Sequence, residues 1–187
     1  MQQESHCLLF IGKFDMNSTK LFEQIAKSDS ENNFFLLLDT AKNYLFIRRW
    51  LKKLSFKKLK QIGNLFEGTI DETSPLEVSP LLIPIHFETK DELNKQFLIE
   101  ENIGMFSVLE TPLSKHELIQ HLQPFLQAEL PTGELALFRF YDPFIIQVLN
   151  QMLNEQEYSD LLKPITNWWV QQMDNTFLNL ESHCYAD

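Results

Sequence analysis

Short apolar runs bounded by polar residues recur along the chain, and such runs are typical of buried β-strands. The clearest one, residues 34–38 (FFLLL), has the length and position of a buried central strand. Similar runs predict strands over 6–12, 81–87 and 103–109. Within 81–87, Pro84 lacks the amide hydrogen that a central strand uses, so this strand is expected at a sheet edge or beside a bulge.

Between these runs, apolar residues recur at the three- and four-residue spacing of amphipathic helices. Ser18 can cap the first such helix. Ser114 and Glu117 form a capping box for a later helix that Pro124 should end. Helices are therefore predicted over 19–27, 44–54, 91–101, 115–123, 143–153 and 155–162.

Residues 125–141 predict a β-hairpin whose short loop contains Pro131 and Gly133. Directly after it, Asp142 can cap a helix that begins with Pro143, where the missing amide hydrogen of proline costs nothing. The segment 168–180 fits either a second hairpin or a helix, because its periodicity does not decide between them.

The alternation of strands with helices predicts an α/β fold, a single domain over residues 1–187 with a mixed β-sheet flanked by helices. A chain of 187 residues has the usual length of one domain. In this fold the predicted hairpin leads into a strand-to-helix corner formed by Phe138–Pro143 (FRFYDP).

Arg139 carries the strongest physical constraint in this corner. It shares a strand face with Leu135 and Leu137, which predicts a partly buried guanidinium that must pair with a carboxylate or with carbonyls. Either Asp142 or Asp39 can provide the carboxylate. The segment is interpreted first as a structural corner of Asp39, Arg139, Asp142 and Pro143. The alternative is a partner-binding surface made of Arg139, Phe140, Tyr141 and Phe144.

The charge is negative and unevenly spread. The chain has 16 Lys+Arg and 26 Asp+Glu, a formal net charge of −10, and residues 101–187 hold 3 of these cations against 12 of these acids. This balance argues against non-specific binding of nucleic acids or anionic membranes. The exception is 48–60, which holds seven cations interleaved with apolar residues. A solvated helix face, a docking face for an acidic protein and a nucleic-acid surface all remain open for it.

No residue spacing in the chain is typical of a catalytic or metal site. The five histidines fit no zinc motif, and the chain has no nucleophile elbow and no phosphate-binding glycine loop. Cys7 and Cys184, each directly after a histidine in the sequence, are expected to be free thiols. We therefore predict no catalytic residue, no metal and no cofactor. Without a secretory signal or a long apolar run, the protein is expected in the cytoplasm with no membrane span.

Residues 130–149 (LPTGELALFRFYDPFIIQVL) resemble the signature of the bacterial type VI secretion adaptor domain, the Tap/TEC family of effector chaperones. Similar pieces of the family pattern occur in the expected order over about residues 34–170. They are FFLLLDTAKNYL, NLFEGT, LEVSPLLIPI, SKHELIQHLQPFLQAELP and LKPITNWW. Two positions depart from the pattern, because Phe144 stands where the family has arginine and Lys42 stands where it has another arginine.

The resemblance implies an adaptor without enzymatic activity, which binds a toxin effector in the cytoplasm and loads it onto the VgrG spike of the secretion machine. The expected partners are then the effector and VgrG. Two other classes stay open from the residues alone. One is an immunity protein that covers the active site of a toxin with its acidic half, and the other is a small α/β enzyme that uses Cys7 or a histidine.

Overall fold

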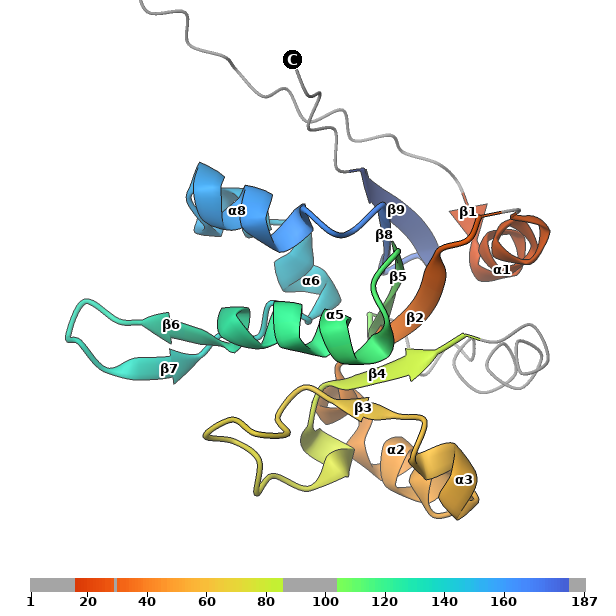
Figure 1. Ribbon diagram of the computed structural model, residues 1–187, viewed down its shortest axis with the longest axis horizontal. Helices are drawn as coiled ribbons and strands as arrows, with labels where there is room; N and C mark the ends of the chain where they lie inside the picture. The colour runs from red at the N-terminus through yellow and green to blue at the C-terminus, as the bar shows by residue number, and fades with distance from the viewer. Residues whose placement is uncertain (1–15, 29, 86–103, 182–187) are drawn as a thin grey trace, which may run out of the picture.

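The computed structural model describes residues 16–28, 30–85 and 104–181, and these residues are built around one seven-stranded sheet (Figure 1). The strand order is β1-β9-β8-β5-β2-β4-β3, so β5 is central and β2 lies beside it. The strands are β1 (Met16–Asn17), β2 (Asn33–Leu38), β3 (Gly63–Asn64), β4 (Leu81–Pro84), β5 (Phe106–Thr111), β8 (Asn167–Gln171) and β9 (Thr176–Glu181).

Helices cover both faces of this sheet. Figure 1 shows α5, α6 and α8 on one side of it and α1 on the other, with α2 and α3 at its lower end. The α-helices are α1 (Ser18–Lys27), α2 (Tyr44–Leu51), α3 (Phe56–Leu59), α5 (Lys115–Leu122), α6 (Pro143–Ile146), α7 (Leu149–Met152) and α8 (Glu155–Leu162). The described residues also include the 3₁₀ turns η1 (Thr40–Asn43), η2 (Leu76–Val78) and η4 (Gln123–Leu126).

Side chains that alternate along β2 divide the apolar residues between two cores. Phe35 and Leu37 point into the core under α5, α6 and α8, while Phe34, Leu36 and Leu38 point into the core under α1 and α2. A strand buried on both faces needs a continuous apolar run, which explains the FFLLL sequence.

The α/β class and the flanking helices expected from the sequence are confirmed, and one detail of the sheet differs. Every strand pair in the described residues is antiparallel, whereas a mixed sheet was expected. The apolar pattern indicates which segments are strands but carries no information on their relative direction. Pro84 is placed as expected, because the short β3 pairs only with Leu81 and Leu82 and leaves Pro84 at an edge.

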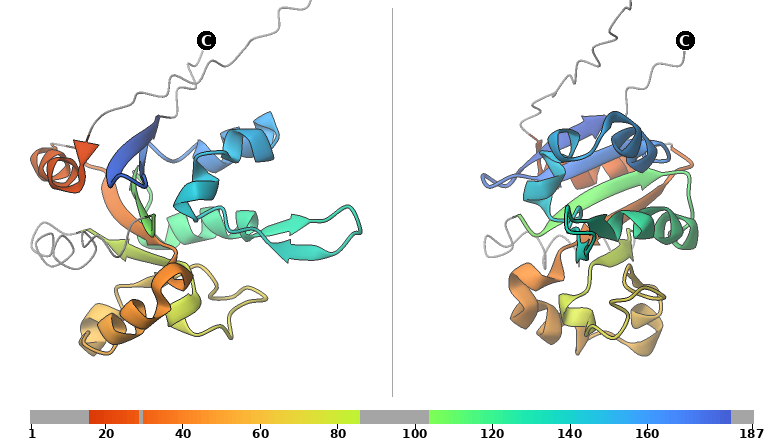
Figure 2. Two further views of the ribbon diagram at one scale, coloured as in Figure 1. Left: turned by 180° about the vertical axis from the view of Figure 1, so that it is seen from behind. Right: turned by 90° about the vertical axis from the view of Figure 1, so that its left-hand side faces the viewer.

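The predicted hairpin is present as β6 (Gln127–Glu129) and β7 (Leu135–Leu137), a separate two-stranded sheet that projects beyond α5 (Figures 1 and 2). Its second strand ends at Leu137 and does not continue to Tyr141 as expected. A turn follows, closed by the Asp142 N–H, which donates to the Arg139 carbonyl at 3.0 Å. This turn directs Phe140 and Tyr141 into the core.

The single helix expected over 143–153 is instead the pair of short helices α6 and α7. The break lies at Val148, whose φ of −121° and ψ of 10° are not helical. The bend allows Ile146 and Leu149 to reach the same core, where each is at most 1 % exposed. Packing therefore outweighs the helical periodicity here.

Of the remaining expectations, some are confirmed by the structure and others concern residues that it does not describe. The capping box of Ser114 and Glu117 begins α5 as predicted. Residues 168–180 form the hairpin of β8 and β9 and not a helix, with Asn175 at a φ of 63° in its turn. The strand expected over 6–12, the helix expected over 91–101 and both cysteines lie outside the described residues.

Candidate functional site

An ion pair between Asp39 and Arg139 joins two segments one hundred residues apart. Asp39 directly follows β2, and its amide donates to the Met105 carbonyl at 2.9 Å, so the carboxylate is held at the end of the sheet. Its side chain is 1 % exposed, and Arg139 Nη2 donates to Asp39 Oδ2 at 2.5 Å. Asp142 Oδ2 is farther from the same nitrogen, at 4.0 Å. Asp39 is therefore the carboxylate that the partly buried arginine requires.

Asp142 has two other roles in the same corner. As the N-cap of α6, it accepts a hydrogen bond from the Phe144 amide at Oδ1, at 2.9 Å, with Pro143 buried at the first helical position. The same oxygen lies 2.6 Å from Lys42 Nζ, in η1. One carboxylate thus begins a helix and ties it to the turn that follows β2.

The two positions that depart from the family pattern meet in space. Lys42 Nζ lies 3.9 Å from the centroid of the Phe144 ring, in cation–π geometry. The tip of the ring lies close to Gly104, where an added Cβ would come within 2.6 Å of Phe144 Cζ. Phe144 is 38 % exposed and has both Lys42 and Gly104 as close neighbours.

We expect Gly104→Ala to lower the free energy of unfolding by more than the roughly 1–2 kcal/mol that a left-handed φ costs an alanine. Gly104 has φ +67°, and its added Cβ would also displace the Phe144 ring. Gly68→Ala is the matched control, because Gly68 has φ +76° with nothing within 4 Å of an added Cβ. Denaturant unfolding of both variants checks this, and equal losses would contradict a tight contact between Gly104 and Phe144.

Phe140 and Tyr141 are buried, which corrects their assignment to a partner-binding surface. Phe140 is fully buried and Tyr141 is 3 % exposed, with their rings in edge contact at 5.8 Å between centroids. The strand ends before them, so both rings turn into the core. Of the four residues assigned to partner binding, Arg139 and Phe144 are the two that a partner can reach.

Burial also sets the electrostatics of the corner. It raises the pKa of the Asp39 carboxyl, and the adjacent Arg139 guanidinium opposes that rise. Burial likewise raises the pKa of the Tyr141 hydroxyl above its usual range, so this hydroxyl stays protonated at neutral pH. The corner therefore pairs a buried carboxyl with a guanidinium beside a neutral tyrosine, an arrangement suited to structural pairing.

Sequence reasoning did not assign Lys42 and Gly104 to the corner. Lys42 carried a signal, since it is one of two departures from the family pattern, but the pattern did not link it to Phe144. Gly104 carried none beyond its being one of only five glycines in the chain. Its role depends on a ring that comes from a segment forty residues away.

The two histidines within the described residues have structural surroundings. His121 Nε2 lies 2.9 Å from the Leu161 carbonyl, and its ring packs against Phe125 with 5.8 Å between centroids. His116 lies on the exposed side of α5. Among residues 16–28, 30–85 and 104–181, no three His, Cys, Asp or Glu side chains are grouped as metal ligands.

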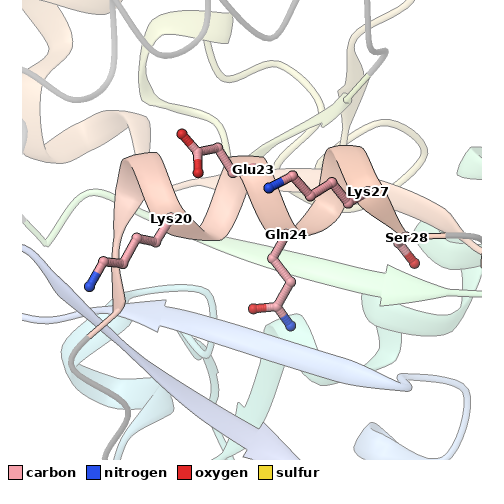
Figure 3. Close-up of a pocket in the computed structure, with 5 residues that line it drawn as sticks. All are labelled: Lys20, Glu23, Gln24, Lys27 and Ser28. Atoms are coloured by element: carbon pink, nitrogen blue, oxygen red, sulfur yellow. The ribbon is translucent and has the colours of Figure 1, made fainter.

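Two hollows of the described surface bring no reactive groups together. One follows the outer side of α1, where Figure 3 shows Glu23 and Gln24 pointing to opposite sides of the helix. Another lies between residues 68–71 and the end of α5, lined by amides, apolar groups and Asp71. Within the same described ranges, no helix has the length and apolar character needed to cross a membrane.

A family model described as a domain of unknown function, DUF4123, matches residues 34–160. The matched region begins in β2 and ends in α8, so it contains the whole corner. No curated protein and no solved structure was found to match the chain. Because the family model covers more than half of its length, the chain belongs to the DUF4123 family.

Proposed function

We propose that this protein is a type VI secretion adaptor, which binds a toxin effector in the cytoplasm and loads it onto the VgrG spike without doing chemistry. One observation carries the proposal. The segment that resembles the adaptor signature forms the ion-paired corner of Asp39 and Arg139, and this corner is the base of the projecting β6–β7 hairpin. Such an arrangement supports presentation of a surface to another protein.

The hairpin supplies apolar area for that contact. Leu130, Leu135 and Leu137 are all exposed, and Leu135 is the most exposed of them, at 64 %. Register places Leu135 opposite Glu129 and Leu137 opposite Gln127, so these four side chains share one face of the hairpin. Exposed apolar groups rimmed by polar ones usually mark interaction sites. We assign this face, together with Arg139 and Phe144, to effector binding.

The second candidate function is that of an immunity protein. The observation that favours it is the acidic outer side of α8, where Glu155, Glu157 and Asp160 are exposed. An acidic surface suits a cationic toxin active site. The two candidates differ in what loss of the gene does to the cell that makes the toxin.

Deletion of the gene tests the proposal. We expect secretion of one cognate effector to be lost, while export of the tube and spike proteins continues and a plasmid copy restores secretion. The measurement is immunodetection of the effector, spike and tube proteins in culture supernatant. Unchanged effector secretion, or loss of all export, would contradict the adaptor role. Sensitivity of sister cells to the toxin after deletion would favour the immunity protein instead.

A further inference from the structure

The positive charge of this acidic protein is concentrated on one surface. Between Asp39 and Glu67 the sequence contains no Asp or Glu, although the chain as a whole has 26. The same interval holds half of the sixteen Lys and Arg residues. We call the cations of α2 and α3 and of the residues beside them the basic surface: Arg48, Arg49, Lys52, Lys53, Lys57, Lys58 and Lys60.

The fold places these cations outward in an ordered array. Ile47, Trp50 and Leu51 bury the inner side of α2 in the core that it shares with α1, so the opposite side must face water. Arg48 and Arg49 lie on that opposite side, and Lys52 and Lys53, each four residues further along, continue it in the turn directly after α2. Residues at this spacing are neighbours on a helix, so the two pairs form adjacent rows.

Three cations of the basic surface have no acidic partner among the residues that the structure describes. Arg48 Nε lies 3.8 Å from Glu77 Oε1, on η2, which packs against α2. Within the part of the chain that the structure describes, no carboxylate pairs with Arg49, Lys52 or Lys53. Lys115 adds a further cation at the edge, because its Nζ donates to the Gln61 carbonyl at 2.9 Å.

Exposed apolar side chains border the basic surface. Phe56 is 72 % exposed, and Tyr44 and Leu45 stand at the start of the two cation rows on α2. Leu76 and Val78 of η2 are also exposed beside that helix. A purely solvated helix face does not need this apolar area. Cations mixed with aliphatic and aromatic groups fit a ligand that carries both carboxylates and apolar side chains.

The geometry favours a protein segment over a nucleic acid. Lys60 Nζ lies 4.5 Å from the centroid of the Phe56 ring and occupies a face on which a base would stack. A long polyanion such as a nucleic acid would also extend beyond this surface onto the rest of the molecule. It would be repelled there, because the protein has a net charge of −10. A short segment avoids that repulsion, because charges are screened beyond about 8 Å at physiological ionic strength.

We infer that the basic surface binds an acidic, amphipathic helical segment of another protein. Glutamates at four-residue spacing in that segment would match the two cation rows of α2, and its apolar residues would cover Tyr44, Leu45 and Phe56. The eight residues of α2 extend about 12 Å, which corresponds to about two turns of such a helix. In Figures 1 and 2 this surface lies at the opposite end of the molecule from α8. The inference does not depend on the proposed function.

Fluorescence anisotropy with the purified full chain tests the inference. The probe is a fluorescein-labelled helical peptide of about five turns, built from Glu, Ala and Leu with glutamates at four-residue spacing. We expect saturable binding that weakens with added salt. Reversing two charges, Arg49→Glu with Lys53→Glu, is expected to raise the dissociation constant at least about tenfold, because like charges then face each other. The neutral pair Arg49→Gln with Lys53→Gln should have an intermediate effect.

The control reverses two exposed cations elsewhere, Lys27→Glu with Lys163→Glu, and changes net charge by the same amount. It is expected to change the dissociation constant less than about twofold. Equal weakening by the control would overturn the inference, as would tighter binding of an oligothymidylate of equal charge at the same salt. Self-association of the wild-type chain that the Arg49 and Lys53 variant abolishes would assign the surface to a second copy and would also overturn it.

Discussion

Replacing Arg139 with leucine is expected to lower the free energy of unfolding by up to about 3 kcal/mol, because it leaves the buried carboxylate of Asp39 without its partner. The loss comes from Asp39, which is 1 % exposed and would remain buried without its guanidinium. Arg139 itself is 42 % exposed, so water can solvate it if the carboxylate is removed instead. We therefore expect Asp39→Asn to cost less than Arg139→Leu, as measured by denaturant unfolding monitored by tryptophan fluorescence.

The double variant Arg139→Leu with Asp39→Asn separates this explanation from a simple loss of packing. It removes the unpaired charge, so it should be more stable than Arg139→Leu alone. Burial already raises the pKa of Asp39, and loss of Arg139 removes the opposing effect. The folded variant then binds the proton more tightly than the unfolded chain, so the cost of Arg139→Leu should shrink as pH falls from neutral. A double variant less stable than Arg139→Leu, or a cost independent of pH, would contradict the pairing.

If the protein is an adaptor, Leu135→Asp is expected to weaken effector binding about 30-fold or more. Central apolar anchors in interfaces contribute about 2 kcal/mol or more each, which corresponds to that factor. Leu135 is 64 % exposed on β7, so its replacement should leave the fold intact. The dissociation constant is measured by calorimetry with the purified effector, and the thermal midpoint of each variant reports on folding.

Met173→Asp is the matched control for this substitution. Met173 is also an exposed apolar residue next to a hairpin turn, at 70 % exposure, but it lies beside β8 and β9. Met173→Asp adds the same charge as Leu135→Asp, but away from the β6–β7 face, so it should leave effector binding unchanged. If the Leu135→Asp and Met173→Asp variants bind the effector with the same dissociation constant, the β6–β7 face is not part of the effector contact. The inference about α2 and α3 would be unaffected.

The elements that the sequence predicts well are those whose signals are local. The FFLLL run, the capping box of Ser114 and the N-cap at Asp142 each act within a few residues of the chain, and each is present in the fold. The helix over 143–153 failed for the opposite reason. Its apolar spacing is regular, but the core that Ile146 and Leu149 share is reached only when the chain bends at Val148.

The candidate site shows the same division. The strand face that Arg139 was expected to share with Leu135 and Leu137 predicts that it requires a carboxylate, and the sequence leaves Asp39 and Asp142 as the choices. The structure selects Asp39 because the end of β2 brings it beside a turn one hundred residues later. The contact of Lys42 with Phe144 and the close approach of Gly104 are likewise tertiary, so no local pattern predicts them.

The measurement that tests the proposed adaptor role most directly is formation of a complex between this protein and the effector whose secretion its deletion is expected to abolish, both purified. An inactive effector variant and size-exclusion chromatography with light scattering are suitable. The account predicts a stable stoichiometric complex that then binds the spike protein, whereas the effector alone does not. A complex that inhibits the active toxin but never joins the spike, or no complex at all, would contradict the account.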